Sequence, residues 1–393
     1  MSTSMYDTIL ETTPRGERIK LCIQCGMCSG ICPHGFVMEY PPRLLIAALR
    51  ADDVAPVFES ETLWLCMSCF ACSQVCPAQI PLTSGLLARL KAEMLLRGKV
   101  PAELQSALEN TRRYGNPLGE SPRKRAAWAM GLTTPVPIMA QLKETVDVLW
   151  FVGDYASYHP RVQSVSKAMA RIFQALGVRF GILGPEENSD GDVQCLAGER
   201  GLFELLAQKN GRTLSKYRFK EIVTTDPHTY NVFKNEYPTV GFSFPVKHYT
   251  QFLAERLTQL KPLLRHEQKY RVTYHDPCTL GRANHNDVYE EPRQLLQAIP
   301  GLEFVEMPHN RANTICCGGG GGGNWLDGFT WERAHTRTSE WRVKEALGSG
   351  AQILAVACPY DMPRFEDAVK STGQEKELIV KDIAELLTDA IFD

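Results

Sequence analysis

Hydrophobic residues recur at helical spacing near the start of the chain, within residues 41–52 and 81–98. A third amphipathic stretch covers residues 101–115 and leads into a polar segment that contains Pro, Arg and Gly. We therefore expect a helical N-terminal region, followed along the chain by a connecting segment.

The pattern changes from about residue 146 onward. An apolar run at 146–153 predicts a strand, residues 162–177 predict a helix that ends at a glycine, and residues 178–184 predict another strand. Strands that alternate with helices in this way are typical of α/β units with a parallel sheet.

The chain after residue 146 also resembles an internal duplication. Twice, a short apolar strand leads into a residue that is followed by proline and an aromatic ring, with a phenylalanine further on. The paired segments are 221–233 with 353–365, 245–257 with 379–391, and 192–199 with 313–320. Tandem copies of this kind predict two similar α/β lobes.

Composition narrows the class of protein. The 393 residues are 44% hydrophobic and 22% charged, as in an ordinary soluble globular protein. A net charge of −2 gives no electrostatic case for binding nucleic acid or an anionic membrane. No apolar run approaches the length of a membrane span, and residues 1–18 lack the apolar core of a signal peptide. We expect a cytoplasmic protein that reaches a membrane only through a partner protein.

Thirteen cysteines are the unusual feature of this composition. Metal ligation is favoured over a disulfide framework, because cytosolic thiols are kept reduced. Eight of the cysteines form two runs of one spacing, Cys22-x2-Cys25-x2-Cys28-x3-Cys32-Pro33 and Cys66-x2-Cys69-x2-Cys72-x3-Cys76-Pro77.

This spacing is that of two-cluster bacterial ferredoxins, in which the fourth cysteine of each run ligates the other cluster. Structural zinc is the alternative, but zinc sites usually contain pairs of cysteines rather than triplets. We therefore predict two [4Fe–4S] clusters. The first is assigned to Cys22, Cys25, Cys28 and Cys76, and the second to Cys66, Cys69, Cys72 and Cys32.

Three further cysteine motifs follow, HDPC at 275–278, CCGGGGGG at 316–323 and CPYD at 358–361. Their order resembles that of the cysteine-rich CCG domain. With the ferredoxin-type runs, almost the whole chain resembles the D-type subunits of heterodisulfide reductase, in which the C-type and B-type polypeptides are fused. The phrases NRANTICCGGGGG and TYHDPCTLGR are the most specific parts of this resemblance.

In that family, a complete CCG domain supplies five cysteines to a non-cubane [4Fe–4S] cluster, and a pair of these clusters cleaves a disulfide. Here Cys278, Cys316, Cys317 and Cys358 match, whereas Asp361 replaces the fifth cysteine. The four thiolates suffice for a third cluster, cubane or non-cubane, with Asp361 as an oxygen ligand or a hydrogen-bonding neighbour. Relics of a decayed site are the alternative.

The first lobe departs further from the family pattern. Its matching positions are Asp154, Cys195, Leu196, Asp226 and Thr229. A single thiolate cannot hold a cluster, so we expect this lobe to be metal-free and Cys195 to be a small core residue.

Other residues near the C-terminal motifs have expected roles. No lysine follows glycines 318–323, so we expect this run to approach a cluster and present amide N–H groups to its sulfur atoms, rather than cradle a phosphate. His275 and His309 are expected to flank the site, where His275 either donates to sulfur or is an ordinary buried histidine. Residues 331–342 are expected to form an ordinary helix face or a partner contact.

The predicted fold is α+β and multidomain, with a helical two-cluster region followed by two tandem CCG-type lobes. The predicted divisions are a ferredoxin-type domain at 1–100, a connecting helical segment at 101–145, a degenerate lobe at 146–265 and a lobe with retained cysteines at 266–393.

We expect an iron–sulfur electron-transfer subunit of a multi-subunit redox complex. Clusters pass single electrons, so the partner is expected to be a flavoprotein, a hydrogenase or a membrane quinone-reactive subunit. The alternative is a catalytic subunit that reduces a disulfide or persulfide at the C-terminal cluster, with Cys317 and Asp361 as candidate catalytic residues. A scaffold that only docks partners is the third possibility. By resemblance, the setting is anaerobic or sulfur metabolism.

Overall fold

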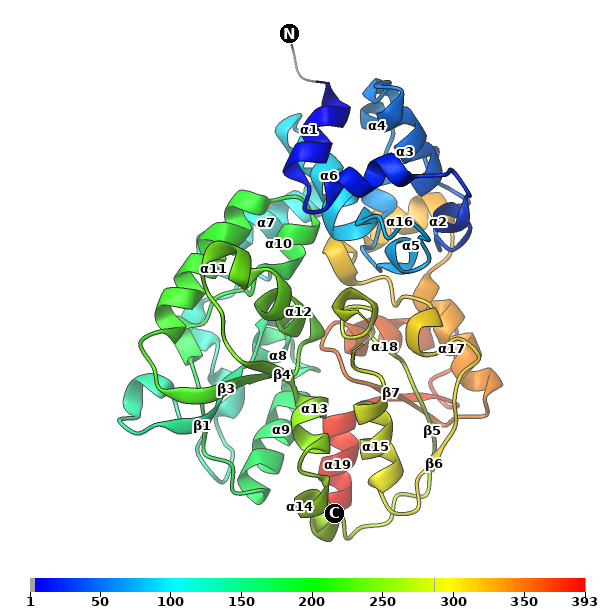
Figure 1. Cartoon of the computed structure of the whole chain (residues 1–393). Coiled ribbons are helices and arrows are strands. Elements are labelled where there is room, and N and C mark those ends of the chain that lie inside the picture. The colour runs from blue at the N-terminus through cyan, green and yellow to red at the C-terminus, as the bar shows by residue number, and fades with distance from the viewer. Residues whose placement is uncertain (1–3, 286, 393) are drawn as a thin grey trace.

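A computed structural model describes residues 4–285 and 287–392. A helical N-terminal region lies over two α/β units that stand next to one another (Figure 1). The helices of this region are α1 (Met5–Thr12), α2 (Met27–Gly30), α3 (Pro42–Arg50), α4 (Ala55–Glu59), α5 (Ala71–Gln74) and α6 (Ala88–Leu96), and α7 (Ala102–Tyr114) follows.

The predicted N-terminal helices are present, with one difference. The apolar stretch at 81–98 begins as a π-helical turn at Leu82–Leu87 before it continues as α6. The end of the predicted connecting segment also joins the first sheet, because Ile138 forms a parallel bridge with Ile182.

The first α/β unit contains a parallel sheet in the order β2-β1-β3-β4. Its strands are β1 (Val146–Phe151), β2 (Phe180–Ile182), β3 (Phe219–Thr224) and β4 (Val246–His248). Its helices are α8 (Asp154–Tyr158), α9 (Gln163–Ala175), α10 (Asp192–Leu196), α11 (Arg200–Leu214), α12 (Pro227–Asn235), α13 (Tyr249–Ala254) and α14 (Leu257–Leu260).

The second unit contains a parallel sheet in the order β6-β5-β7-β8, which is the same order when strands are counted within each unit. Its strands are β5 (Arg271–Tyr274), β6 (Glu303–Phe304), β7 (Ile353–Val356) and β8 (Ile379–Asp382). Its helices are α15 (Glu290–Ala298), α16 (Asp327–Ala334), α17 (Thr338–Gly348), α18 (Asp361–Ser371) and α19 (Ile383–Phe392). The predicted parallel α/β structure is thus observed in both sheets.

One apolar core extends from the first sheet to the second. Helix α9 packs on α19, and α13 packs on α15. Arg161 adds ion pairs across this junction, to Glu366 at 2.5 Å and to Glu385 at 2.7 Å. The two units therefore form one packed body, on which the carboxyl ends of several strands face the cysteine motifs.

Candidate functional site

The four thiols assigned to the first cluster line one cavity. Cys22, Cys25, Cys28 and Cys76 surround it together with apolar side chains such as Ile46 and Leu82. Cys25 is exposed, whereas Cys28 is buried. Burial raises the pKa of the Cys28 thiol, and the nearby Cys22 and Cys76 raise it further.

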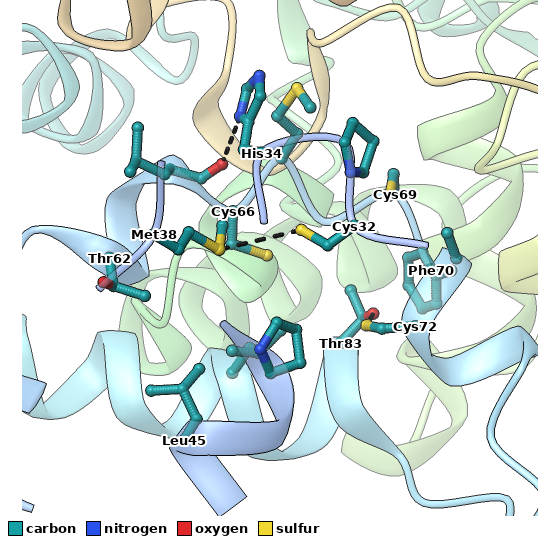
Figure 2. A pocket seen from close by; sticks show the side chains of 16 residues that line it. Cys32, His34, Met38, Leu45, Thr62, Cys66, Cys69, Phe70, Cys72 and Thr83 are labelled. Carbon is teal, nitrogen blue, oxygen red and sulfur yellow. Dashed lines mark hydrogen bonds between the residues drawn. The ribbon is translucent and has the colours of Figure 1, made fainter. Parts of the chain in front are cut away.

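The four thiols assigned to the second cluster line another cavity, shown in Figure 2. Cys32, Cys66, Cys69 and Cys72 surround it, although Cys32 belongs to the first run in sequence. Burial raises the pKa of Cys32, and the neighbouring Cys69 and Cys66 raise it further. Burial and the neighbouring thiols thus keep Cys32 protonated in the absence of metal. Because metal ligation requires deprotonated thiols, binding of iron would displace this proton.

The two cysteine loops have the same backbone conformation. Gln24 and Gly26 in the first loop have positive φ angles of 56° and 87°, and Ser68 and Phe70 in the second have 50° and 60°. These residues occupy equivalent places in the two runs. The left-handed conformation costs a non-glycine residue roughly 1–2 kcal/mol, so its recurrence indicates a loop shape that the site requires.

The C-terminal motifs meet at the carboxyl ends of β5 and β7, where ligands bind in parallel α/β sheets. The sulfur atoms of Cys278 and Cys316 lie 3.9 Å apart. The Gly318 amide donates to the Cys316 sulfur and the Gly319 amide donates to the Cys317 sulfur, both at 3.3 Å. Two amides of the glycine run are therefore directed at cysteine sulfur, and their bonding to the sulfur atoms of a cluster stays a prediction.

Cys317 lies beside His275 and Asp361, and the ligating atoms of the three residues lie within 4.8 Å of one another. All three are buried. A hydrogen bond from Cys316 lowers the pKa of Cys317 well below its usual value, with further lowering from His275 and Asp361. Burial raises the pKa of the Asp361 carboxyl well above its usual value, and the Cys317 thiolate raises it further.

His275 is held by a residue that the sequence did not single out. The Nε hydrogen of Arg342 is donated to His275 Nδ1 at 3.3 Å, and Arg342 Nη1 donates to the His309 carbonyl at 2.8 Å. Arg342 is fully buried, so the expectation of an ordinary helix face at 331–342 is wrong at this position. His309 itself is exposed and pairs with Glu345, so its backbone rather than its ring supports the site.

The second cysteine loop reaches the C-terminal motifs. Cys69 and Cys316 line one groove, and the neighbouring Cys316 thiol lowers the pKa of Cys69 to about 6. Arg282 donates from Nε to the Cys69 carbonyl at 2.9 Å and from Nη1 to the Thr314 carbonyl at 2.6 Å. The groove is also lined by Ile31, Phe36, Arg282, Asn313 and Trp341, among others. The sequence signal for Arg282 was its place in the specific phrase TYHDPCTLGR.

At three matching positions of the first unit, polar side chains stand in place of thiols: Asp154, Asp226 and Thr229. Buried Arg125 pairs with Asp154 at 2.5 Å and with Glu187 at 2.7 Å. The Thr229 hydroxyl donates to Asp190 at 2.6 Å. Each of these groups has a partner within the protein.

Two more residues of the first unit lie in different settings. Cys195 is partly buried on α10 beside the Arg200 guanidinium, 3.7 Å from its Nη1, and packs against the apolar core of the unit. His228 faces the second unit instead. It bonds to Asp192 at 2.6 Å, and a ring nitrogen lies within 4.8 Å of a carboxylate oxygen of Asp226 and of the Cys358 sulfur. The Asp192 carboxylate raises the pKa of His228 to about 10, although burial opposes this shift.

Two protein families match this chain. Residues 18–80 match the 4Fe-4S dicluster domain, and residues 272–360 match the cysteine-rich domain, CCG. The first match confirms the prediction of two [4Fe–4S] clusters in the N-terminal region, whose two four-thiol cavities suit them. The second match covers the HDPC and CCGGGGGG motifs and ends within CPYD.

Curated relatives agree with these matches. The probable iron-sulfur-binding oxidoreductase FadF of Bacillus subtilis is 34% identical over 302 residues, 76% of this chain and 42% of the relative. The EtfAB:quinone oxidoreductase of Syntrophomonas wolfei is 32% identical over 344 residues, 85% of this chain and 47% of the relative. The D-type polypeptide of the Methanosarcina barkeri heterodisulfide reductase is 31% identical over 312 residues, 77% of this chain and 71% of the relative.

This chain spans 42–59% of the length of three relatives: FadF, the Syntrophomonas protein and a probable membrane-anchored ferredoxin of Chromohalobacter salexigens. In the described part of the chain, every helix is too short or too polar to cross a bilayer. Two of these relatives are named as oxidoreductases, one as a ferredoxin and one as a subunit of a heterodisulfide reductase. At the identity and coverage found for the Methanosarcina protein, the chain belongs to the family of D-type heterodisulfide reductase subunits.

Proposed function

We propose that this chain is an iron–sulfur electron-transfer subunit whose two N-terminal clusters exchange electrons with a third centre in the second α/β unit. A [4Fe–4S] cluster, when bound, accepts and releases single electrons. Cys22, Cys25, Cys28 and Cys76 would hold one cluster, and Cys32, Cys66, Cys69 and Cys72 the other. The observation that supports this assignment is the sorting of these thiols into two cavities of four, with Cys32 and Cys76 exchanged.

The third centre would be held by Cys278, Cys316, Cys317 and Cys358. All four thiols are buried. Cys278 and Cys358 follow strands β5 and β7, whereas Cys316 and Cys317 lie in the loop that leads to α16. Cys69 and Cys316 line the same groove, and this proximity supports direct passage of electrons from the second N-terminal cluster to this centre. Exposed Cys25 puts the first cluster nearest to a partner at the surface.

We further propose that the two α/β units are copies of one CCG-type lobe, at 146–265 and 266–393. The shared strand order supports this duplication. A reciprocal contact supports it as well. Helices α9 and α15 follow the first strand of their own unit, and α19 and α13 follow the fourth strand. Helix α9 packs on α19 of the other unit, and α15 packs on α13 of the other unit. In the first copy, side-chain pairing has replaced metal ligation.

The partner would be a flavoprotein, a hydrogenase or a membrane quinone-reactive subunit. These enzymes supply two-electron chemistry that single-electron carriers lack. Relatives whose printed names include a quinone oxidoreductase and a membrane-anchored ferredoxin support a membrane-linked complex. This chain would then meet the membrane through its partner.

The test is quantification of iron and acid-labile sulfide in anaerobically prepared protein, with EPR spectroscopy at stepwise potentials. Three centres predict about twelve iron atoms per chain, and two clusters alone predict about eight. A count near eight, with no third EPR signal, would reduce the C-terminal half to a scaffold. Colourless protein without labile sulfide would reject the whole proposal.

A second candidate function is reduction of a disulfide or persulfide at the third centre. The groove beside Arg282 favours it, because this groove reaches the cysteines at 69 and 316 from the surface. Turnover of a disulfide substrate by the wild type, abolished in Cys317→Ser, would identify the chain as a catalytic subunit. If all three centres can be reduced but no disulfide substrate is turned over, the electron-transfer function is the one supported.

A further inference from the structure

A buried carboxyl group with no cation bonded to its Oδ2 atom among the described residues lies inside the proposed third centre. Asp361 is 1% exposed, and its Oδ2 atom has no nitrogen or oxygen hydrogen-bond partner among the described residues. The Asp361 amide is bonded to the Cys358 carbonyl at 3.1 Å, so the backbone at the start of α18 fixes where the side chain begins. A buried, ionised carboxylate is costly unless a cation or a metal ion compensates it.

Among the described residues, no cationic side chain is bonded to this oxygen. His275 Nε2 lies 3.8 Å from Asp361 Oδ2, which is too far for a hydrogen bond. Arg342 interacts with Asp361 through its charge but is not bonded to it: its Nε hydrogen goes to His275 Nδ1, and its Nη1 bonds Glu345 and a carbonyl. Asp361 Oδ2 therefore has no nitrogen or oxygen partner among the described residues, and the carboxyl group lies beside the Cys317 sulfur.

The first α/β unit shows what a completed polar site looks like. Thr229 occupies the position that matches Asp361, and its hydroxyl is satisfied by Asp190 at 2.6 Å. The neighbouring Asp154 is paired with Arg125 at 2.5 Å. In the matched site of the second unit, Asp361 Oδ2 thus has no nitrogen or oxygen partner among the described residues, whereas the Thr229 hydroxyl of the first unit is bonded to a carboxylate.

The hydrogen bonds of His275 indicate whether its ring can ligate iron or can only donate a hydrogen bond. Because His275 Nδ1 accepts the Arg342 hydrogen, the neutral His275 ring carries its own hydrogen on Nε2. Nε2 also has no nitrogen or oxygen partner among the described residues, and it shares a 4.8 Å sphere with Cys317 and Asp361. An N–H group cannot ligate iron, so it is left to donate to the Cys317 sulfur.

We propose that Asp361 ligates an iron atom of the third centre through oxygen, in the place of the family's fifth cysteine, while His275 donates an N–H hydrogen bond to Cys317. This inference rests on the proposed function only in requiring that the third centre exists. One iron of that centre would then differ from the others, with a carboxylate ligand that exchanges more readily than a thiolate.

The experiment compares ⁵⁷Fe-labelled, anaerobically prepared wild type with Asp361→Cys and Asp361→Ala by Mössbauer and EPR spectroscopy. We expect the wild type to contain about twelve iron atoms, with one subsite of the third centre set apart by its isomer shift. Asp361→Cys should keep the iron count and move that subsite to sulfur-ligated values. Asp361→Ala should lose about one iron atom per chain.

Asp382→Asn is the matched control, since Asp382 is similarly buried but bonded to Tyr249 at 2.7 Å, and it should leave the spectra unchanged. Wild-type spectra and iron content in both Asp361 variants would overturn the proposal while leaving the third centre intact. An iron count near eight in the wild type, unchanged in Cys317→Ser, would instead overturn the third centre itself.

Pulsed EPR on the third centre tests the role of His275. The expected result is a weak nitrogen coupling, of the size produced across a hydrogen bond, that disappears in His275→Phe while the iron count stays the same. A strong directly bonded nitrogen coupling that His275→Phe removes would make histidine the ligand and overturn the assignment.

Discussion

Arg282 donates its Nε hydrogen to the backbone carbonyl of Cys69 at 2.9 Å, and so ties the second cysteine loop to the C-terminal motifs. Its Nη1 atom bonds the carbonyls of Ala312 and Thr314 at 3.2 and 2.6 Å. Nη2 is buried without a partner among the described residues. One fixed cation thus lies where the second N-terminal cluster and the proposed third centre come together.

Replacing Arg282 with Gln should slow electron transfer between these two sites and lower the reduction potential of the third centre. The reason is loss of a buried positive charge beside Cys69, Cys278 and Cys316, whose thiolates interact with it electrostatically. A change on the order of 60 mV corresponds to about 1.4 kcal/mol for one electron. EPR-monitored redox titration measures the potential, and Arg282→Lys, which keeps the charge, should shift it less. Equal potentials in wild type and Gln variant would refute this role.

The exchange of fourth cysteines makes a prediction about paired substitutions. Cys32→Ser should affect the same cluster as Cys66→Ser, so the double variant should lose no more iron than either single one. Combining Cys32→Ser with Cys22→Ser should remove about twice as much, because two clusters are damaged. Iron and sulfide analysis of anaerobic preparations decides between these patterns. The reverse pattern would mean that each run holds its own cluster.

The buried ion pairs of the first unit should matter for stability and not for iron content. Arg125 is 2% exposed, and its replacement by Met leaves two buried carboxylates without their partner. We expect a loss of about 3–5 kcal/mol in the free energy of unfolding. Arg179→Met, at an exposed pair with Asp147, should cost less than about 1 kcal/mol. Denaturant titration measures both, and a drop in iron content in the Arg125 variant would contradict a metal-free first unit.

The glycine run should tolerate a methyl group poorly at one position. A Cβ atom at Gly323 would lie 2.1 Å from the Gly318 carbonyl oxygen, a backbone atom that cannot move without shifting the loop that presents amides to Cys316 and Cys317. Gly323→Ala should therefore cost about 1–3 kcal/mol and disturb the third-centre EPR signal. Gly328→Ala, where no atom lies within 4 Å of the added methyl, is the control. Normal spectra and thermal stability in both variants would show that the loop can adapt.

The junction between the two units predicts a pH dependence. Burial raises the pKa of Asp382 to about 7, despite hydrogen bonds from Ala384 and Tyr249. An Asp carboxyl in the unfolded chain has a pKa of about 4. Between about pH 4 and 7, Asp382 is therefore protonated in the folded chain and deprotonated in the unfolded chain. Stability from this group is fully present below the lower value and is lost as the pH rises through 7. Unfolding measured from pH 5 to 8 should show a decline that Asp382→Asn flattens. A decline of the same size in both proteins would assign it to other groups.

Local sequence was enough to predict the chemistry of this protein. The spacing of the two cysteine runs predicted two [4Fe–4S] clusters, because three thiolates separated by two residues can surround one face of a cluster without help from distant segments. Strand and helix periodicity predicted parallel α/β structure after residue 146, and both sheets have it. The motifs around Cys278 and Cys317 were enough to identify the family.

Which groups face one another became clear from the packing of the folded chain. Arg342 looked like part of a helix surface and is buried against His275, whereas His309 looked like a site residue and its ring is exposed. Cys69 and Cys316 are far apart in sequence and line the same groove in the folded chain. No local pattern indicates that an oxygen of Asp361 is left unpaired. Hydrogen bonding and burial depend on the packing of remote segments, and the free energy of a buried polar group is set by those neighbours and not by its own residue type.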